Sequence, residues 1–186
     1  PGFTVPSGQF EFVAWTELPT DSDNSNDTAR IGSVGVPVIA LSYTSPYQDN
    51  FDVTNVGWST IVTGNPATIW ELGPPAYGQT NSAHSPPNAW DVNLNSAYGN
   101  SAGCDLYSPI FDFTNAVDAK LSFWRNHNTE QNWDGVRMEY SINGGPWTML
   151  GGPNLTAPCW VNWYTMPPIN CSGQPAWAGA AGGWVK

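Results

Sequence analysis

The stretch between Phe123 and Trp147 gathers enough oxygen-bearing side chains to hold a metal ion. Its sequence is FWRNHNTEQNWDGVRMEYSINGGPW, and its oxygen donors include Glu130, Asp134, Asn126 and Asn128. Calcium takes about six to eight hard oxygen ligands, so Glu130 and Asp134 are candidate ligands of a structural Ca²⁺ ion. The alternative interpretation is that Asp134 belongs to an Asp-Gly turn and that Glu130 is a solvated surface charge.

Aromatic side chains in two polar loops could instead bind a glycan. Trp133 lies between Asn132 and Asp134, and sugar sites combine an aromatic platform with nearby Asn or Asp donors. A second group lies in a loop rich in Pro and Asn and consists of Trp160, Trp163 and Tyr164. Exposed aromatic clusters mark interaction sites. The competing explanation is that these rings pack under their loops or against a neighbouring domain.

Most of the common catalytic motifs are missing from the chain, and no enzymatic activity is predicted. HExxH, the Walker loop and the dinucleotide-binding fingerprint are all missing. His84 and His127 stand alone in polar loops, where a histidine is expected to be solvated. A glycosidase needs two carboxylates that flank the scissile bond. Glu130 and Asp134 could form such a pair, but the strand VRMEYS that follows them offers only one carboxylate.

Charge and composition exclude some classes of partner. The chain of 186 residues carries 15 acidic and 5 basic side chains, for a net charge of −10. Nucleic acids and anionic membranes attract basic surfaces, so neither is an expected partner. No apolar run reaches the ~18 residues of a membrane-spanning helix, and no membrane insertion is predicted. The 11 Trp, 7 Tyr and 7 Phe residues supply enough apolar surface for a folded core.

The elements that must position these side chains are short strands. Gly, Pro, Asn, Ser and Thr interrupt the chain every few residues, which is typical of a β-sandwich or barrel. The strands expected span residues 10–16, 58–64, 67–73, 106–113, 118–126, 136–141 and 146–150. The polar stretch 73–105 carries little strand signal and is expected to be a long loop. Asn143 and Gly144 predict a tight hairpin turn, because Asn-Gly tolerates the positive φ angles of a type I′ turn.

The chain has 3 cysteines, and their pairing stays open. Cys159 and Cys171 lie in one loop, APCWVNWYTMPPINCS, at a spacing that fits a disulfide in an oxidising compartment. Cys104 would then be buried or unpaired. The alternative is that all of them are buried thiols. No CxxC pair or Cys/His cluster indicates zinc.

The N-terminal segment resembles the last hairpin of an immunoglobulin-like adhesion module from secreted bacterial proteins. The matching residues are FEFVAWTELPTDSDNSNDTA, in which a strand leads into an aspartate-rich turn that ends in Asn-Asp-Thr. Two strands cannot bury a core alone. Residues 1–44 are therefore expected to be the C-terminal strands of such a domain plus a linker, with the domain boundary just before Tyr47.

Residues 45–186 resemble the MAM-like jelly roll, a concanavalin-type β-sandwich of large secreted bacterial proteins. The matching motifs are NFDVTNVGW, IWELGPP, NAWDVNLNSAYGNSAGCDLYSPIFDFTN, LSFWRNHNTEQNWDGVRMEYSINGGPWTMLG and AWAGAAGGWVK. The fold class implied is all-β, an antiparallel β-sandwich (jelly roll) preceded by the β-hairpin of the immunoglobulin-like domain. In this family two further strands follow the Gly-Gly-Trp motif. The chain is therefore expected to be a segment of a longer protein whose sandwich lacks its last strands here.

The resemblance also implies a role outside the cell. It implies a non-catalytic structural or adhesion module of a large secreted or cell-surface bacterial protein, such as an adhesin, stalk or filament subunit. The expected partners are neighbouring domains or subunits of the same protein, which would complete the sheets by strand addition. The alternative is a carbohydrate-binding module attached to a secreted hydrolase or peptidase, with a glycan as ligand. The family's sandwiches often hold a structural Ca²⁺ near the entry strand, where Asp52 is the matching ligand.

Overall fold

The computed structural model of this chain describes almost only strands and the loops between them. The described residues are 37–53, 57–152, 160–164 and 168–186, together with the backbone of residues 12–15 and 28–31. Within these ranges the only helical element is a short 3-10 turn, η1 (Gly78–Thr80). The described ranges hold no helix that is long and apolar enough to cross a bilayer. The expected all-β class is confirmed.

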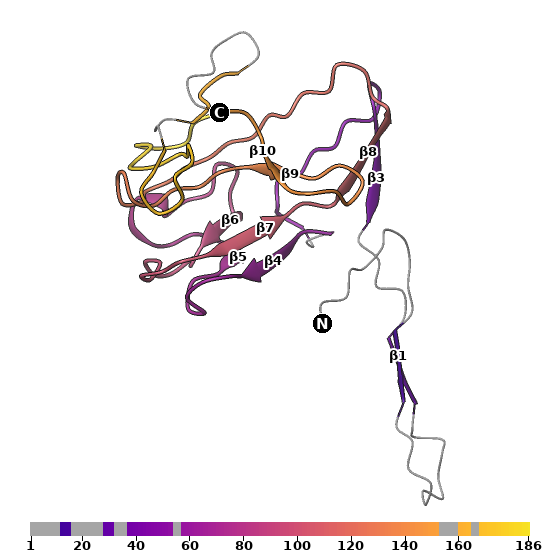
Figure 1. Cartoon of the computed structure of the whole chain (residues 1–186), viewed down its shortest axis with the longest axis horizontal. Helices are drawn as coiled ribbons and strands as arrows, with labels where there is room; N and C mark the ends of the chain where they lie inside the picture. Colours follow the sequence, from indigo (N-terminus) through magenta and orange to yellow (C-terminus); the bar gives the residue numbers. More distant parts are fainter. Residues whose placement is uncertain (1–11, 16–27, 32–36, 54–56, 153–159, 165–167) are drawn as a thin grey trace, which may run out of the picture.

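The N-terminal strands form a hairpin of their own. β1 (Phe12–Trp15) and β2 (Thr28–Ile31) pair antiparallel along their whole length. In Figure 1 this pair lies apart from the body formed by the later strands. The expected hairpin is therefore confirmed, whereas its membership of an immunoglobulin-like domain stays a prediction.

Three antiparallel pairs lie in the body of the molecule. β4 (Ser59–Val62) pairs with β7 (Cys104–Tyr107), and β5 (Trp70–Gly73) pairs with β6 (Ala89–Val92). These two pairs are neighbours, because β5 also approaches β7 (Figure 1). The third pair consists of β9 (Glu139–Tyr140) and β10 (Thr148–Met149). Several small sheets therefore replace the broad sheets of a complete sandwich within the described residues.

One pair is parallel, and the expectation of purely antiparallel pairing is wrong for it. β3 (Val38–Ser42) runs parallel to β8 (Ile110–Asn115), with Val38 opposite Ile110. Parallel strands need a long connection, and here strands β4 to β7 lie within that connection. We call this pair the parallel ribbon. β3 comes before residue 45 and β8 after it, so the ribbon joins both sides of the predicted domain boundary, which itself stays a prediction.

Local turn chemistry was predictable, but some strands were not. Asn143 and Gly144 have φ angles of 53° and 72°, and the Gly145 amide donates to the Ile142 carbonyl, which confirms the Asn-Gly turn. The strand expected over 118–126 is wrong, since its backbone pairing is limited to an isolated bridge at Arg125. β6 lies inside the stretch 73–105 that we expected to be a loop, because hydrogen bonds from β5 stabilise it as a strand.

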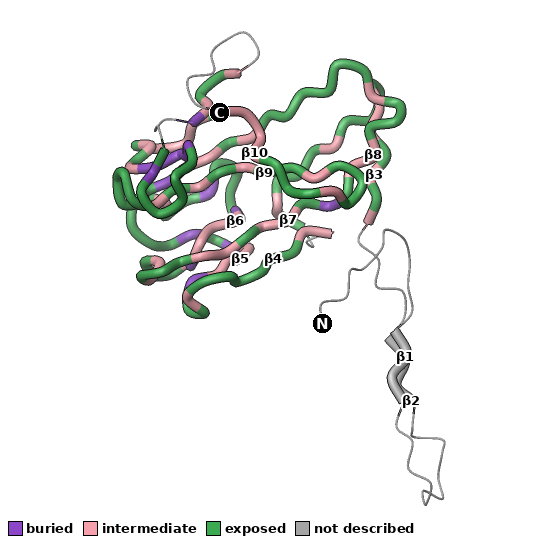
Figure 2. The backbone as a smooth tube through the Cα atoms, in the orientation of Figure 1, coloured by how far each residue is buried: buried purple, intermediate pink, exposed green. Residues whose placement is uncertain are grey.

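A buried apolar cluster lies in irregular segments near the C-terminus and not in the parallel ribbon. Ile169, Ala176 and Ala178 form a buried apolar cluster, and Trp177 beside them is only 3% exposed. Figure 2 shows buried segments along the C-terminal part and the β5–β6 region, whereas the parallel ribbon contains exposed and half-buried residues only. Long-range packing of rings and loops therefore positions the candidate sites.

Candidate functional site

The loop of residues 129–135 presents Trp133 to solvent. The Trp133 side chain is 53% exposed, and its neighbour Asn132 is exposed as well. The amides of Trp133 and Asp134 both donate to the Glu130 carbonyl, at 3.2 and 3.0 Å, and Asn132 has a φ angle of 69°. The Asn170 amide donates to the Asn132 carbonyl at 2.8 Å. The backbone thus holds the loop in a tight turn that leaves the indole face open.

The Tyr98 hydroxyl forms hydrogen bonds to both predicted metal-binding residues of this loop. Its hydroxyl donates to Oδ2 of Asp134 at 3.0 Å and accepts from the Glu130 amide at 3.0 Å. Burial is the main cause of the raised pKa of Tyr98, and its bond to the Asp134 carboxylate raises that pKa further. One Asp134 oxygen is therefore already used, and Glu130 is exposed. These contacts resemble the turn that was the alternative to a calcium site.

The other predicted oxygen donors of this loop, from Asn126 and Asn128, do not complete a cluster of anionic metal ligands. The Asn126 amide nitrogen donates to the Gln79 carbonyl at 3.1 Å, and Asn128 is exposed. Across the described part of the chain, no three His, Cys, Asp or Glu side chains come together at a metal-binding distance. Because calcium also accepts amide and carbonyl oxygens, calcium binding by Glu130 and Asp134 stays a prediction.

Asp52 lies in an acidic turn next to the aromatic residues of the entry segment. Its Oδ2 accepts from the Asn50 side chain at 2.6 Å, but its Oδ1 is buried and has no hydrogen-bond partner among the described residues. Phe51 has a φ angle of 63°, which is uncommon for a bulky residue. A buried carboxylate oxygen without a partner is costly. This oxygen fits a cation ligand, which is the role expected for Asp52.

The second predicted aromatic group is packed tightly. Trp160, Trp163 and Tyr164 join Phe123 and Trp177 in a set of ring contacts with centroid separations between 4.8 and 6.3 Å. We call these residues the Trp177 cluster. Tyr164 is buried, and its hydroxyl accepts from the Met138 amide and lies 3.0 Å from the Leu150 carbonyl. This placement fits the competing explanation that these rings pack under their loop, and it leaves Trp133 as the most open of the predicted aromatic residues.

The two histidines differ from each other, and the expectation of a solvated histidine is wrong for one of them. His84 is exposed, and its ring stacks on Trp124 at 4.0 Å with Trp184 at its edge. His127 is only 7% exposed. Its burial follows from main-chain pairing, because the Ala181 amide donates to the His127 carbonyl and draws the C-terminal segment over the ring.

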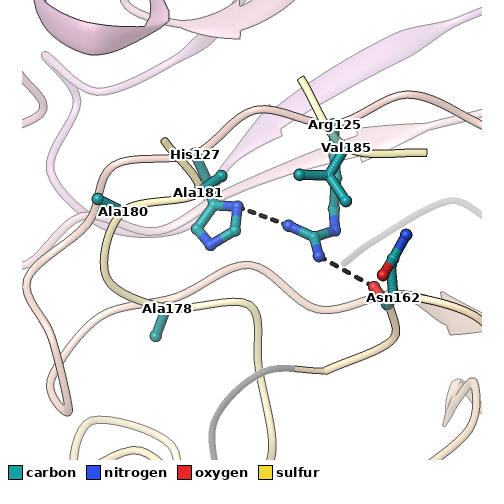
Figure 3. Close-up of a pocket in the computed structure, with 7 residues that line it drawn as sticks. All are labelled: Arg125, His127, Asn162, Ala178, Ala180, Ala181 and Val185. Carbon is teal, nitrogen blue, oxygen red and sulfur yellow. Dashed lines mark hydrogen bonds between the residues drawn. The ribbon is translucent and has the colours of Figure 1, made fainter. Parts of the chain in front are cut away.

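His127 lines a cavity that it shares with Arg125. The cavity has a volume of about 250 Å³, and Figure 3 shows its lining residues Arg125, His127, Asn162, Ala178, Ala180, Ala181 and Val185. The Arg125 guanidinium lies 2.9 Å from Nδ1 of His127, donates to the Asn162 carbonyl at 2.9 Å and stacks over Trp177. Sequence reasoning missed this pair. Their spacing of two residues, which places both on one face of an extended segment, was the available signal.

The tautomer of His127 follows from its neighbour. Arginine has only donors, so Nδ1 must accept the hydrogen bond from Arg125 and the neutral ring carries its proton on Nε2. Burial lowers the pKa of His127 below its ordinary value of 6.5, and the Arg125 cation lowers that pKa further. Burial also lowers the pKa of Arg125, whose guanidinium stays charged at neutral pH. The cavity therefore contains one fixed positive charge.

The predicted disulfide cannot be placed, because Cys159 lies outside the described residues. Cys171 is exposed, and its amide donates to the Trp133 carbonyl at 3.3 Å, so this cysteine supports the Trp133 loop. Cys104 lies half-buried in β7, and burial raises the pKa of its thiol. The Cys159–Cys171 pairing stays a prediction.

Comparison with known proteins finds no relative of this chain. No protein-family model, curated protein or solved structure matches the chain.

Proposed function

We propose that this chain is a non-catalytic adhesion module of a secreted or cell-surface protein, with a jelly-roll β-sandwich as its complete fold. The observation that carries the proposal is the open parallel ribbon. Val38, Ile110 and Phe113 are 49%, 41% and 53% exposed on it. Neither β3 nor β8 has a second strand neighbour among the described residues. An exposed apolar strand pair with free edges invites another strand or sheet.

The proposed partner is a second β-rich unit, either another subunit or a neighbouring domain of the same protein. Exposed apolar side chains on a strand pair are unfavourable in water, and they gain stability when a sheet covers them. The excess of acidic side chains keeps other surfaces of the same molecule apart. Association through one defined region is what a stalk or filament subunit needs.

The experiment is sedimentation velocity over a range of concentrations of the 186-residue chain. We expect reversible association in the wild type and at least about tenfold weaker association in Phe113→Glu, because a charge would be buried in the contact. Ile142→Glu is the matched control, since Ile142 is also exposed but lies in the β9–β10 turn. A wild type that stays monomeric at every concentration, or an equal loss in both variants, would contradict the proposal.

A second candidate function is glycan binding by the Trp133 loop. The exposed indole beside Asn132 supports it, because sugar rings stack on open aromatic faces while amides bind their hydroxyls. A glycan array should then give signals that Trp133→Ala abolishes. Trp147→Ala is the control, since Trp147 is 56% exposed in another part of the molecule. Loss of signal in both variants, or no signal for the wild type, would argue against this candidate.

We also propose that Asp52 contributes to a structural calcium site. A ligand that binds only the folded chain stabilises it by about 2.7 kcal/mol at a hundred times its Kd. Calcium should therefore raise the Tm of the wild type, and Asp52→Asn should remove most of that rise because it replaces an anionic oxygen. Glu130→Gln compares the second candidate site in the same assay. An identical rise of the Tm with calcium in wild type and Asp52→Asn would contradict a calcium site at Asp52.

A further inference from the structure

Among the described residues, Arg125 is a partly buried cation that forms no ion pair. Acidic residues outnumber basic ones 15 to 5 in this chain. Even so, the ion pair in the described residues is formed by Arg137 with Glu139, and no carboxylate lines the cavity. Arg125 instead directs its N–H groups at Nδ1 of His127 and at the Asn162 carbonyl, both of which are neutral. Partly buried charges are normally paired, so the cavity has an uncompensated positive charge.

The guanidinium is also held ready for a ligand. The ring of Trp177 lies 5.1 Å from the central carbon of the guanidinium. The hydrogen bonds from Arg125 to His127 and Asn162, drawn in Figure 3, fix the plane of the guanidinium. Arginine has five N–H donors, and among the described residues these bonds leave some of them without an acceptor. An arginine that is already oriented loses little entropy when it binds a planar anion.

We propose that this cavity binds a small organic carboxylate, whose oxygens accept hydrogen bonds from Arg125 and whose carbon skeleton packs against Ala178, Ala180 and Ala181. This inference goes beyond the proposed adhesive function and uses none of the residues that carry it. A single guanidinium matches the charge and the planar shape of one carboxylate. The alanine and valine side chains around it offer apolar walls to the rest of the ligand.

The cavity also disfavours the other common anions. Its volume of about 250 Å³ is room for a small molecule of metabolite size and not for a polymer chain. A phosphate dianion needs more donors than one arginine offers, and the net charge of −10 repels multivalent anions at long range. Neutral sugars do not need the cation. The ligand class that fits is therefore a monocarboxylate, either a simple aliphatic acid or a sugar acid.

The test is an NMR titration of the whole ¹⁵N-labelled chain with sodium propionate and sodium glucuronate at constant ionic strength. The comparison ligands are inorganic phosphate and glucose. We expect saturable shifts of the Arg125 side chain and of the Ala180 and Ala181 amides with at least one carboxylate, at a Kd below about 10 mM. No saturable shift with either carboxylate, or equal saturation with phosphate or glucose, would overturn the proposal.

Variants locate the binding. Arg125→Gln should weaken carboxylate binding at least about tenfold, because it removes the charge and the fork. Arg137→Gln is the matched control and should leave the Kd within about twofold. Should Arg125→Gln fail to fold, Arg125→Lys keeps the charge without the fork and should weaken binding at least about fivefold. Wild-type affinity in Arg125→Lys, or an equal loss in Arg137→Gln, would contradict recognition by Arg125.

Discussion

The Trp177 cluster and the parallel ribbon are built in opposite ways. The cluster has almost no regular strands, yet its rings and backbone bridges exclude water from Trp177 and Tyr164. The ribbon contains the longest strand of the described residues, β8, and yet no residue of β3 or β8 is buried. The parallel ribbon and the Trp177 cluster thus separate strand pairing from ring burial in the described part of the molecule.

The difference suggests separate roles, in which the Trp177 cluster stabilises the fold and the parallel ribbon is available for contact with a partner. Burial of apolar surface stabilises a fold roughly in proportion to the area removed from water, so the Trp177 cluster should dominate the free energy of unfolding. The ribbon contributes backbone pairing with little burial. It can therefore be exposed, altered or covered by a partner at small cost to the fold of the isolated chain.

The largest expected effect is that of Trp177→Ala. Trp177 is 3% exposed and contacts Phe123, Trp163 and Tyr164, so its truncation leaves a large cavity. We expect a loss of about 3–5 kcal/mol in the free energy of unfolding, measured by urea denaturation. Phe113→Ala in the ribbon is the control and should cost less than about 1 kcal/mol, because Phe113 is half exposed. Equal losses in the two variants would abolish the distinction between the regions.

A smaller effect is expected from Tyr164→Phe. The Tyr164 hydroxyl accepts from the Met138 amide at 3.0 Å and can donate to the Leu150 carbonyl. Its removal leaves the half-buried Met138 amide without this acceptor, at a cost of about 1–3 kcal/mol, whereas the Leu150 carbonyl still accepts from the Trp163 indole. Tyr140→Phe should change the same measurement by less than about 0.5 kcal/mol, since Tyr140 is exposed. A neutral Tyr164→Phe would mean that the ring packing alone stabilises the cluster.

The smallest expected effect is a pH dependence at the edge of the cluster. The pKa of His127 is lowered in the folded chain, so the unfolded chain binds the proton more readily. The neutral His127 ring therefore stabilises the folded chain fully at pH values above the ordinary histidine pKa of 6.5. This stabilisation is lost as the pH falls through the lower pKa of His127 in the folded chain. Thermal melting between pH 7.5 and 5 should show a steeper decline for the wild type than for His127→Asn.

The control for this pH dependence is His84→Asn. His84 is exposed and stacks on Trp124, outside the Arg125 cavity. This variant should follow the wild-type curve. Identical slopes for wild type and His127→Asn would show that the buried imidazole does not titrate with folding.

The sequence predicted what depends on neighbouring residues. The Asn143-Gly144 turn was predictable because the positive φ angles are a property of those residues alone. The all-β class followed from the density of turn formers. The parallel pairing of β3 with β8 was not predictable, because the two strands are far apart in sequence and nothing local selects their partner. The sequence around β6 likewise predicts a loop, because the pairing of β6 with β5 is not encoded in the neighbouring residues.

The candidate site was predictable only where exposure is a local property. Trp133, flanked by polar residues, is open as expected. Trp163 and Tyr164 stand in an equally polar loop, yet contacts with Phe123 and Trp177 cover them. Arg125 and His127 meet because the segment that ends at Val185 pairs with their backbone. That pairing spans many residues, and beyond the two-residue spacing of Arg125 and His127 nothing in their immediate sequence indicates it.

The most direct test of the whole account is native-state hydrogen exchange of the backbone amides. At the Trp177 cluster, the Val136 amide donates to the Trp177 carbonyl at 3.0 Å and the Trp177 amide donates to the Val136 carbonyl at 2.9 Å. At the parallel ribbon, the Ile110 amide donates to the Pro37 carbonyl. We expect the amides of Val136 and Trp177 to exchange at least about a hundredfold more slowly than those of β3 and β8. Ribbon amides that exchange as slowly as those of Val136 and Trp177 would contradict the claim that the cluster is the core and the ribbon the open contact surface.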